Sequence, residues 1–283
     1  MASVALLGAG LLGSGFAENL LAKGHSLRVW NRTASKLAPL VQKGAQLAGS
    51  AAEAVAGVER VHLVLAEDDA VEAVLAAMSP GLAPQTPIFD HSTNLPARVA
   101  ERVPRLRAQG LRYVHAPVFM SPNDARNATG LMLFAGPASE FEAAKQALSS
   151  MTGKLWHVGE RPDLAAAYKL FGNAFLLSVA GTMGDILAMG DNMGIGPDGV
   201  AALFETFRPS PAFLASRVAQ RGQAPASFEL SMARKDVRLM IEAAGGPEGL
   251  VTLPAVAAAM DAAIERGEAE RDFAVYAWPR PLR

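Results

Sequence analysis

The chain has 283 residues, and its 26 Lys plus Arg side chains nearly balance its 27 Asp plus Glu, which gives a formal net charge of −1 at pH 7. This length suggests one large domain or two ordinary ones, and 51% hydrophobic residues are ample for a buried core. The balanced charge argues against nucleic acid or another polyanion as a partner. Because the chain has no cysteine, it has no disulfide framework or thiol nucleophile, which fits a cytoplasmic protein.

A glycine-rich turn follows the first apolar run, at residues 3–7, and precedes a helical pattern. Its three glycines have the G-x-G-x-x-G spacing, which permits a tight bend, a close approach of the backbone to a pyrophosphate, and close packing of helix on strand. The N–H groups and dipole at the helix start would hold the phosphate. We therefore predict a dinucleotide site at Gly8, Ala9, Gly10, Leu11, Leu12 and Gly13.

The second strand is expected at residues 27–30 and is followed by Asn31, Arg32 and Thr33. A fold that binds NAD usually has an acidic residue here, which binds the ribose 2′-hydroxyl. An acid would repel the 2′-phosphate of NADP, whereas Arg32 can pair with it. These three residues therefore predict NADP in preference to NAD; the alternative is an arginine in a solvent-exposed turn.

Strands and helices alternate up to about residue 160. Strands are expected at 61–65, 87–89, 111–118, 131–135 and 154–159. Helices are expected at 51–58, at 70–78, from residue 96 onwards and at 138–151, and a loop is expected at 119–130. This alternation predicts an α/β fold with a doubly wound sheet. The loops at the carboxyl ends of such strands line the ligand crevice.

Two strand ends carry candidate site residues. The backbone of Leu65 and Ala66 is a candidate cofactor contact. Ser92 and Thr93 follow the next strand. Their hydroxyls are candidates to face the crevice. The alternative is that Ser92, Thr93 or Asn94 caps the helix that begins at residue 96, and the two roles are compatible.

Other charged residues in this half have simpler interpretations. Asp68 and Asp69 resemble a catalytic carboxylate pair, but are expected to begin a helix. His62 lies in an apolar strand, and no metal site is predicted because no second ligand has suitable spacing. A solvent-exposed face is expected for the arginines of the helix that begins at residue 96, Arg98, Arg102, Arg105 and Arg107.

Helical patterns dominate from about residue 163, so the boundary between two domains is expected near 160. Helices are expected at 164–189, 197–207, 211–220, 228–244 and 253–267. In the first, Lys169 and Asn173 are four residues apart and share a face. A lysine in so apolar a helix either extends to solvent or serves a site, where desolvation would lower its pKa. The uncharged stretch 170–184 is too short to span a bilayer, so no membrane segment is expected.

Together these motifs resemble the β-hydroxyacid dehydrogenases, a family that includes 3-hydroxyisobutyrate dehydrogenase and the glyoxylate and succinic semialdehyde reductases. The resemblance extends from residue 4 to about residue 274. It rests on the segment Gly8 to Leu20, Asn31-Arg32-Thr33, Asp90-x-Ser92-Thr93 with Pro96, Ala116-Pro117-Val118, Lys169-x-x-x-Asn173, Lys235-Asp236 and Asp272-Phe273-Ala274.

The resemblance implies a Rossmann-type NADP-binding domain at 1–160 and an all-α domain at 161–283, which binds substrate and forms a homodimer or homotetramer. It implies hydride transfer between the nicotinamide and a small hydroxy acid, aldehyde or keto acid. Lys169 would be the general acid and base, with Asn173 and Asp236 as substrate contacts. Thr93 and Lys235 would reach the cofactor.

The loop expected to contact substrate departs from the family pattern. The family usually follows A-P-V with S-G-G, whose hydroxyl and N–H groups hold the substrate carboxylate. Here Val118 is followed by Phe119, Met120, Ser121 and Pro122, whose bulkier apolar residues weaken the argument for a carboxylate clamp. The candidate substrate contacts in this loop are Val118, Phe119, Met120 and Ser121. The family also has a G-x-G segment before its lysine, where this chain has residues 160–163. The substrate is therefore less well defined than the reaction.

Two alternatives remain open. Residues 118–122 also resemble imine reductases, relatives of the same fold that generally lack the lysine at position 169. The other alternative is a non-catalytic NADP-binding module, which has kept the fold but altered its substrate loop.

Overall fold

The computed structural model describes residues 1–220, 223, 225–226 and 228–277. The chain divides into two compact units, Met1–Asn173 and Ala174–Arg283, and each is described by itself. The division falls within the long helix α8 (Leu164–Asn192), whose residues 164–173 belong to the first unit.

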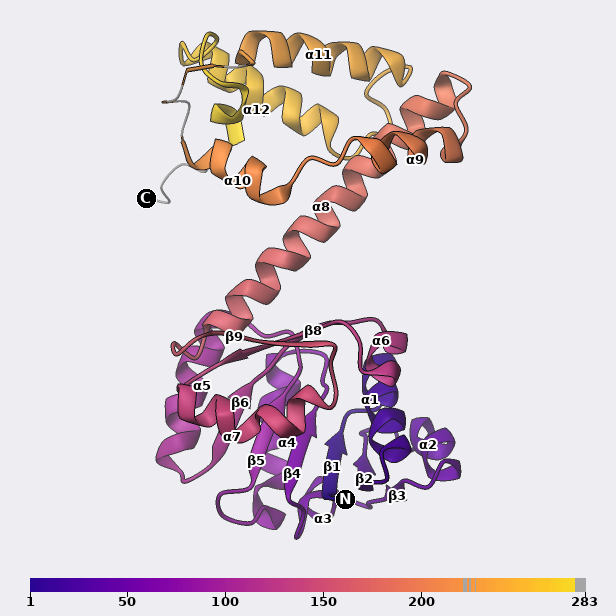
Figure 1. Cartoon of the computed structure of the whole chain (residues 1–283), viewed down its shortest axis with the longest axis vertical. Coiled ribbons are helices and arrows are strands. Elements are labelled where there is room, and N and C mark those ends of the chain that lie inside the picture. Colours follow the sequence, from indigo (N-terminus) through magenta and orange to yellow (C-terminus); the bar gives the residue numbers. More distant parts are fainter. Residues whose placement is uncertain (221–222, 224, 227, 278–283) are drawn as a thin grey trace. The chain divides into compact units, whose positions relative to one another are not determined.

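A six-stranded parallel sheet forms the centre of the first unit, in the order β3-β2-β1-β4-β5-β6 (Figure 1). Its strands are β1 (Ser3–Leu7), β2 (Ser26–Trp30), β3 (Gln46–Leu47), β4 (Arg60–Leu63), β5 (Pro87–Asp90) and β6 (Arg112–His115). The order reverses between β1 and β4, and ligands of such sheets bind at the carboxyl ends of the strands beside this reversal. The predicted doubly wound α/β fold is confirmed.

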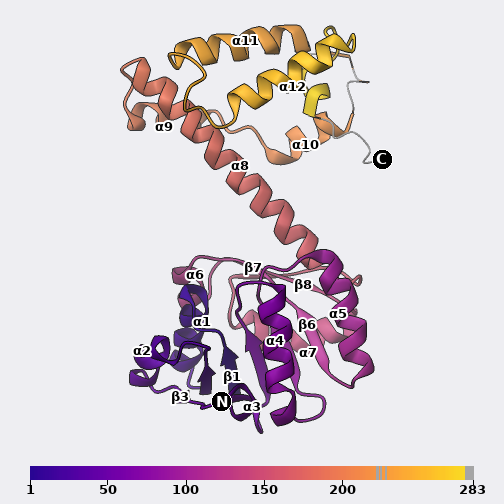
Figure 2. The same ribbon diagram turned by 180° about the vertical axis from the view of Figure 1, so that it is seen from behind.

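Helices cover both faces of this sheet, as Figures 1 and 2 show from opposite sides. One face carries α1 (Leu11–Ala22), the short η1 (Ala34–Leu37) and α2 (Ala38–Gln42), and α7 (Ala138–Ser149). The other carries α3 (Ala51–Val55), α4 (Asp68–Met78) with the short η2 (Ser79–Gly81), and α5 (Pro96–Ala108). Phe16 of α1 and Leu148 of α7 are buried in the first layer, and Leu75 of α4 and Val99 of α5 in the second.

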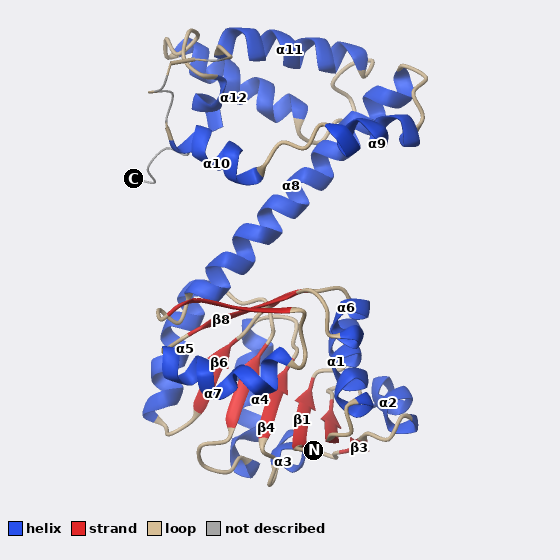
Figure 3. Ribbon diagram, in the orientation of Figure 1, coloured by secondary structure: helices blue, strands red, loops and turns tan. Residues whose placement is uncertain are grey.

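A smaller sheet follows, drawn in red beside α6 in Figure 3. In it β7 (Val118–Phe119) pairs antiparallel with β8 (Leu131–Ala135), which pairs parallel with β9 (Lys154–Gly159). Between β7 and β8 the chain forms α6 (Pro122–Asn127), where the sequence predicted only a loop. The helix forms because Ser121 and Asp124 make a capping box at its start.

Helix α6 packs directly on the helix that follows the glycine turn. A Cβ added at Gly15 of α1 would lie 2.5 Å from the carbonyl oxygen of Pro122. The side-chain amide of the buried Asn19 donates to the carbonyl oxygen of Arg126 at 2.9 Å, close to the end of α6. The two segments expected to hold cofactor and substrate are therefore parts of one packed structure.

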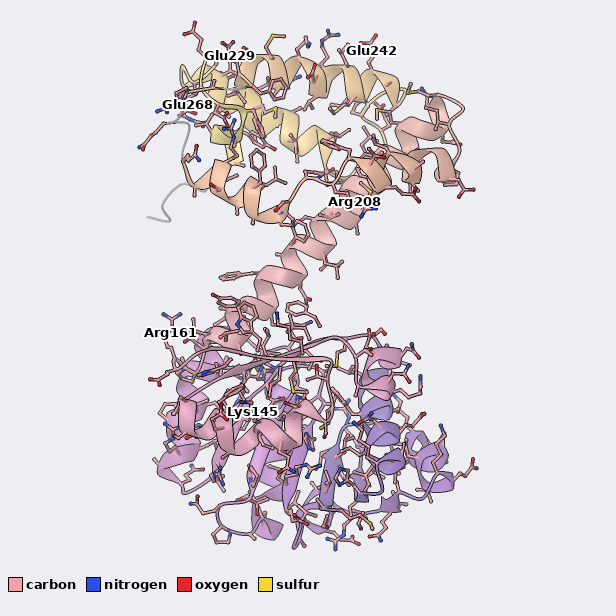
Figure 4. The ribbon with its side chains drawn as sticks, viewed as in Figure 1. Lys145, Arg161, Arg208, Glu229, Glu242 and Glu268 are labelled. Atoms are coloured by element: carbon pink, nitrogen blue, oxygen red, sulfur yellow. The ribbon has the colours of Figure 1, made fainter. Side chains whose placement is uncertain are left out.

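The regular elements that the structure describes in the second unit are helical. Besides most of α8 they are α9 (Pro197–Thr206), α10 (Pro211–Ala219), α11 (Leu230–Ala243), α12 (Leu253–Glu265) and the short η3 (Phe273–Ala277). Leu230 of α11 and Met260 of α12 lie in their shared core, while Glu242 on the exposed face of α11 pairs with Arg238 at 3.2 Å (Figure 4).

Helix α8 is longer than the sequence suggested. It has 29 residues and contains a window with a mean hydropathy of 1.4, of which 6% is buried, so by length and composition alone it could cross a membrane. The core helix of a soluble protein also meets this criterion. Asp185 within it is buried and accepts hydrogen bonds from the backbone N–H groups of Val251, Thr252 and Leu253, which lower the pKa of its carboxyl to about 2. This part of α8 therefore orients the start of α12.

Candidate functional site: the carboxyl edge of the sheet and the start of α8

The glycine turn has the geometry that its spacing predicted. Gly8 has φ +105°, and a Cβ there would overlap the carbonyl oxygen of Val64. A Cβ at Gly13 would overlap the carbonyl oxygen of Gly8, so this glycine lets α1 start directly against the strand end. At Gly10 a Cβ would meet nothing within 4 Å. The first and third glycines are thus required by packing, and the second faces open space.

The start of α1 presents donors into this space. Its first intrahelical bond runs from the N–H of Ser14 to the carbonyl of Gly10, so the N–H groups of Leu11, Leu12 and Gly13 have no partner within the helix. Leu11 is 83% exposed. A helix start with three such donors and a positive dipole end fits the pyrophosphate of a dinucleotide.

The end of β2 borders the same turn. The side-chain oxygen of Asn31 accepts the N–H of Ala9 at 3.1 Å, and its amide donates to the carbonyl of Thr33 at 2.9 Å. Arg32 and Thr33 are exposed, and Arg32 forms no ion pair with any residue that the structure describes. Arg32 is therefore a solvent-exposed cation directly after Asn31, the residue that contacts the glycine turn.

The ends of β4 and β5 are joined by a serine. The N–H of Leu65 donates to the hydroxyl oxygen of Ser92 at 2.9 Å, and Ser92 is buried, whereas Ala66 and Thr93 are exposed. The predicted substrate contact of Ser92 stays a prediction; in this structure its hydroxyl positions the two loops. Thr93 is the hydroxyl that faces outward.

The alternative that these hydroxyls cap the next helix is wrong. The N-cap of α5 is Leu95, with no side-chain cap, and the N–H of Leu95 donates to Asp68 at 2.9 Å. Asn94 instead donates to the buried carboxylate of Asp90 at 2.7 Å. Asp90 also accepts from the hydroxyl of Tyr113 at 2.5 Å, so this acid orders the loop from within.

The expectation of a solvated arginine face on α5 is wrong for Arg102, which is 0% exposed. Its guanidinium donates to Asp68 at 2.6 Å, to Glu72 at 2.8 Å and to Tyr113 at 3.2 Å. Because Arg102 lies three residues after Val99, it points to the buried face of α5. Asp68 and Asp69 begin α4, as predicted.

Lys169 lies in the second turn of α8, in the first unit. Its ammonium nitrogen is 4.2 Å from the centre of the Phe119 ring. Its side chain is partly buried, and desolvation lowers the pKa of its amino group from the usual 10.5. Asn173, one turn further on, is partly exposed. The structure therefore places the predicted lysine against the predicted substrate loop.

The rest of that loop is largely occupied by its own contacts. Val118 is buried, and Met120 is partly exposed. The hydroxyl and the N–H of Ser121 both donate to the carboxylate of Asp124, at 2.7 and 2.8 Å. The hydroxyl that the sequence proposed for a substrate is thus engaged by an acid three residues later.

The turn before α8, which departs from the family's glycine pattern, holds an ion pair of Arg161 with Asp163 at 2.6 Å; Arg161 is labelled in Figure 4. In the second unit, Lys235 and Asp236 lie on α11 and pair with each other at 2.9 Å. Both carry exposed charge, so their predicted contacts with cofactor and substrate stay predictions.

Comparison with known proteins identifies the family. The NAD binding domain of 6-phosphogluconate dehydrogenase matches residues 3–159, more than half of the chain. The chain belongs to the β-hydroxyacid dehydrogenase family. It is similar to 3-hydroxyisobutyrate dehydrogenase of Pseudomonas aeruginosa, with 27% identity over 96% of this chain and 95% of that protein. The 3-sulfolactaldehyde reductase of Escherichia coli is 32% identical over 61% of this chain and 59% of its own length.

A solved structure shows the same fold. The imine reductase from Myxococcus stipitatus in complex with NADP+ superposes with a TM-score of 0.81 over 97% of this chain and 98% of its own, at 23% identity. The family match and the relatives above confirm the family resemblance, and the protein is an oxidoreductase with an NAD(P)-binding domain.

Two residues and one contact that are important to the site were not singled out by the sequence. Asn19 was recognised only as part of the glycine segment, although it holds α6. Asp124, three residues after Ser121, follows the capping-box spacing, which could have revealed α6. The contact of Phe119 with Lys169 had no sequence signal, because the two residues are fifty positions apart.

Proposed function

We propose that the protein is an NADP-dependent oxidoreductase that transfers a hydride between the nicotinamide and the carbon of a small hydroxy acid, aldehyde or keto acid. The observation that carries this proposal is Lys169: a partly buried lysine of lowered pKa, at the start of α8 and against the substrate loop. A proton donor works best when its pKa approaches the working pH.

The proposed cofactor rests on the residues around the glycine turn. The free N–H groups at the start of α1 would hold the pyrophosphate, and Arg32 at the end of β2 would pair with a 2′-phosphate. No acid stands at residues 31–33, where one would bind the 2′-hydroxyl of NAD. The nicotinamide supplies or accepts the hydride when the cofactor is bound.

The chain's own part in the reaction is to move a proton and to orient the substrate. In reduction, the Lys169 ammonium donates a proton to the carbonyl oxygen as that oxygen gains charge. In oxidation, the neutral amine accepts the proton of the hydroxyl. A positioned acid or base of this kind contributes about 10²–10⁴-fold to the rate. Asn173, on the same face of α8, and the exposed Thr93 would orient the substrate.

A panel of substrates tests the reaction. NADPH consumption is measured with succinic semialdehyde, glyoxylate, small uncharged aldehydes and a cyclic imine, for the wild type and for Lys169→Ala. We expect turnover of an aldehyde or keto acid, lost in Lys169→Ala, while the affinity for NADPH changes little. Equal loss of turnover and of NADPH affinity would make the lysine structural and would overturn the assigned role.

The same panel distinguishes the two alternatives. Turnover of the cyclic imine alone would favour an imine reductase, which the similar fold of such enzymes permits. Tight NADPH binding without any turnover would favour a non-catalytic module. Lys169 supports the dehydrogenase over both, since neither alternative uses a desolvated lysine beside the loop.

The proposed oligomer is a homodimer or homotetramer, formed through the second unit. In support, the part of α8 that belongs to this unit exposes large apolar side chains, which are Phe175, Leu176, Leu177 and Val179. A contiguous exposed apolar surface of this kind is typical of an interface. Sedimentation velocity at micromolar concentration tests it, and a monomer would contradict it.

A further inference from the structure

The ring of Phe119 occupies the space beside the proposed proton donor. It lies 4.2 Å from the Lys169 ammonium, and a Cβ added at Gly172 would overlap its outer edge. Lys169 and Gly172 are three residues apart and are neighbours on one face of α8. The absence of a side chain at Gly172 therefore lets the outer edge of the aromatic ring lie close against the helix, next to the amine.

A ring in this position favours a cation and disfavours an anion. The face of an aromatic ring carries negative potential, which attracts the Lys169 ammonium and repels a carboxylate. The ring also has no donor for a carboxylate oxygen. A charged substituent of the substrate placed against the Phe119 ring would lose hydration there and would gain no hydrogen bond from that side chain, which is costly.

The hydrogen-bond donors that follow Phe119 already hold a carboxylate. Asp124 accepts from the N–H and the hydroxyl of Ser121 at 2.8 and 2.7 Å, and from the hydroxyl of Thr129 at 2.8 Å. These bonds lower the pKa of the Asp124 carboxyl, so it is charged at neutral pH. Pro122 has no N–H to offer. The place where this loop could bind an anion is thus filled by the protein's own acid.

We infer that Phe119 and the Ser121–Asp124 pair make this loop selective. It prefers carbonyl substrates that carry no charge on the part of the molecule that contacts the loop. This inference rests on the proposed function and narrows it. The relatives named above are called after substrates with an acid group, such as 3-hydroxyisobutyrate and 3-sulfolactaldehyde. The substrate expected here is instead a small neutral aldehyde or ketone, with Phe119 as the specificity-determining residue.

The test compares two matched ligands, succinic semialdehyde and its methyl ester, which differ in one charge. Their dissociation constants are measured by calorimetry on the protein saturated with NADP+, a state in which an aldehyde cannot be reduced. We expect the ester to bind at least tenfold more tightly than the acid. Binding of the acid as tightly as the ester, or of neither ligand, would overturn the inference.

Two variants test the residues that carry it. Phe119→Ser removes the repelling ring, and Asp124→Asn removes the competing charge, so each should reduce the preference for the ester at least fivefold. Phe119→Tyr keeps the ring and should keep the preference. An unchanged ratio in both of the first two variants would contradict the inference, provided that NADP+ still binds.

The same proteins separate this inference from the proposed function. If the ester is preferred in binding but no carbonyl is reduced with NADPH, the selectivity stands and the proposed reaction fails. If carbonyls are reduced but the acid is preferred, the reaction stands and the inference fails. Direct observation of Lys169 by NMR of ¹³C-dimethylated lysines adds a readout without turnover: Phe119→Leu should lower its pKa, because the ring stabilises the ammonium.

Discussion

His62 Nδ1 lies 2.9 Å from His91 Nε2, and the two rings are stacked with 5.2 Å between their centroids. The Nε–H of Arg60 donates to His62 at 3.2 Å, so His62 carries its proton on Nδ1 and donates to His91. His91 in turn donates to the carbonyl oxygen of Ala116 at 2.7 Å. This buried series ends where the chain enters the loop of Phe119.

These histidines should make the fold sensitive to acid. Burial lowers the pKa of His91 to about 4 and that of His62 well below the usual 6.5, so both rings are neutral in the folded protein. The unfolded chain takes up protons below about pH 6.5. The contribution of these two histidines to the free energy of unfolding is therefore fully present above that pH. It is lost as the pH falls towards 4, by at most about 1.4 kcal/mol per pH unit for each ring.

Urea unfolding between about pH 7.5 and 5 measures this slope. Burial also lowers the pKa of His25 and His115, which add to the effect in the wild type. The control is His91→Asn, which removes one of these rings. The slope of the free energy of unfolding against pH should then correspond to about one proton fewer taken up on unfolding. Equal slopes in the two proteins would show that His91 is not kept neutral by the fold.

Arg32→Asp should reverse the cofactor preference. Loss of a charge-assisted pair with the 2′-phosphate, and repulsion by the new acid, should weaken NADPH binding by about tenfold to a hundredfold, while NADH binding changes little. Fluorescence titration with both nucleotides measures the ratio. Arg112→Asp makes the same charge change on an exposed residue at the amino edge of the sheet and should leave the ratio unaltered. An unchanged ratio in Arg32→Asp would exclude the proposed phosphate contact.

Gly15→Ala should loosen α6 from α1. The added methyl group would lie 2.5 Å from the Pro122 carbonyl oxygen, so α6 must shift, at a cost of about 1–3 kcal/mol in the free energy of unfolding. Gly184→Ala is the matched control on α8, because a Cβ there meets nothing within 4 Å. The control should stabilise the protein by about 0.5–1 kcal/mol, as alanine does in an open helix position. Equal effects of the two changes in thermal unfolding would contradict the close contact of α1 with α6.

The activity should depend on the protonation of Lys169 with opposite signs in the two directions. Reduction needs the ammonium, so kcat/KM for a carbonyl should fall as the pH rises through the pKa of Lys169, which lies below 10.5. Oxidation needs the neutral amine and should rise over the same range. Lys169→Arg remains protonated, so it should lose oxidation over the whole accessible range. If reduction and oxidation by the wild type did not change in opposite directions with pH, this would argue against Lys169 as the general acid and base.

Arg102→Met should destabilise the first unit strongly. Removal of Arg102 breaks a buried ion pair with Asp68 and takes the guanidinium donor from Tyr113, which costs about 3–5 kcal/mol. Arg105→Met removes an exposed partner of Glu72 and should change the free energy of unfolding by less than about 1 kcal/mol. If urea unfolding shows the two substitutions to be equivalent, the network around Arg102 contributes little to stability.

Much of the cofactor region could be predicted because its signals are local. The three glycines act within one turn, and the predicted strands β8 and β9 agree with the structure residue for residue. Helices were also predicted where apolar periodicity is continuous, as in α4 and α7. The errors came where contacts with distant segments override local preference. The pattern of its own helix predicts that Arg102 is exposed to solvent, but in the folded protein it is buried and donates to the carboxylates of α4.

The amino-acid sequence by itself determined the family, the α/β fold and the position of the NAD(P)-binding turn, because these depend on spacing and periodicity over a few residues. Only the tertiary structure decided how the chain uses Phe119 and Ser121. The ring rests against a lysine that lies fifty residues later, and the serine is held by Asp124 in a helix that the sequence had not predicted. Chain folding brings such groups together at distances of a few ångströms, where charge and hydrogen bonding act, and no local pattern records that proximity.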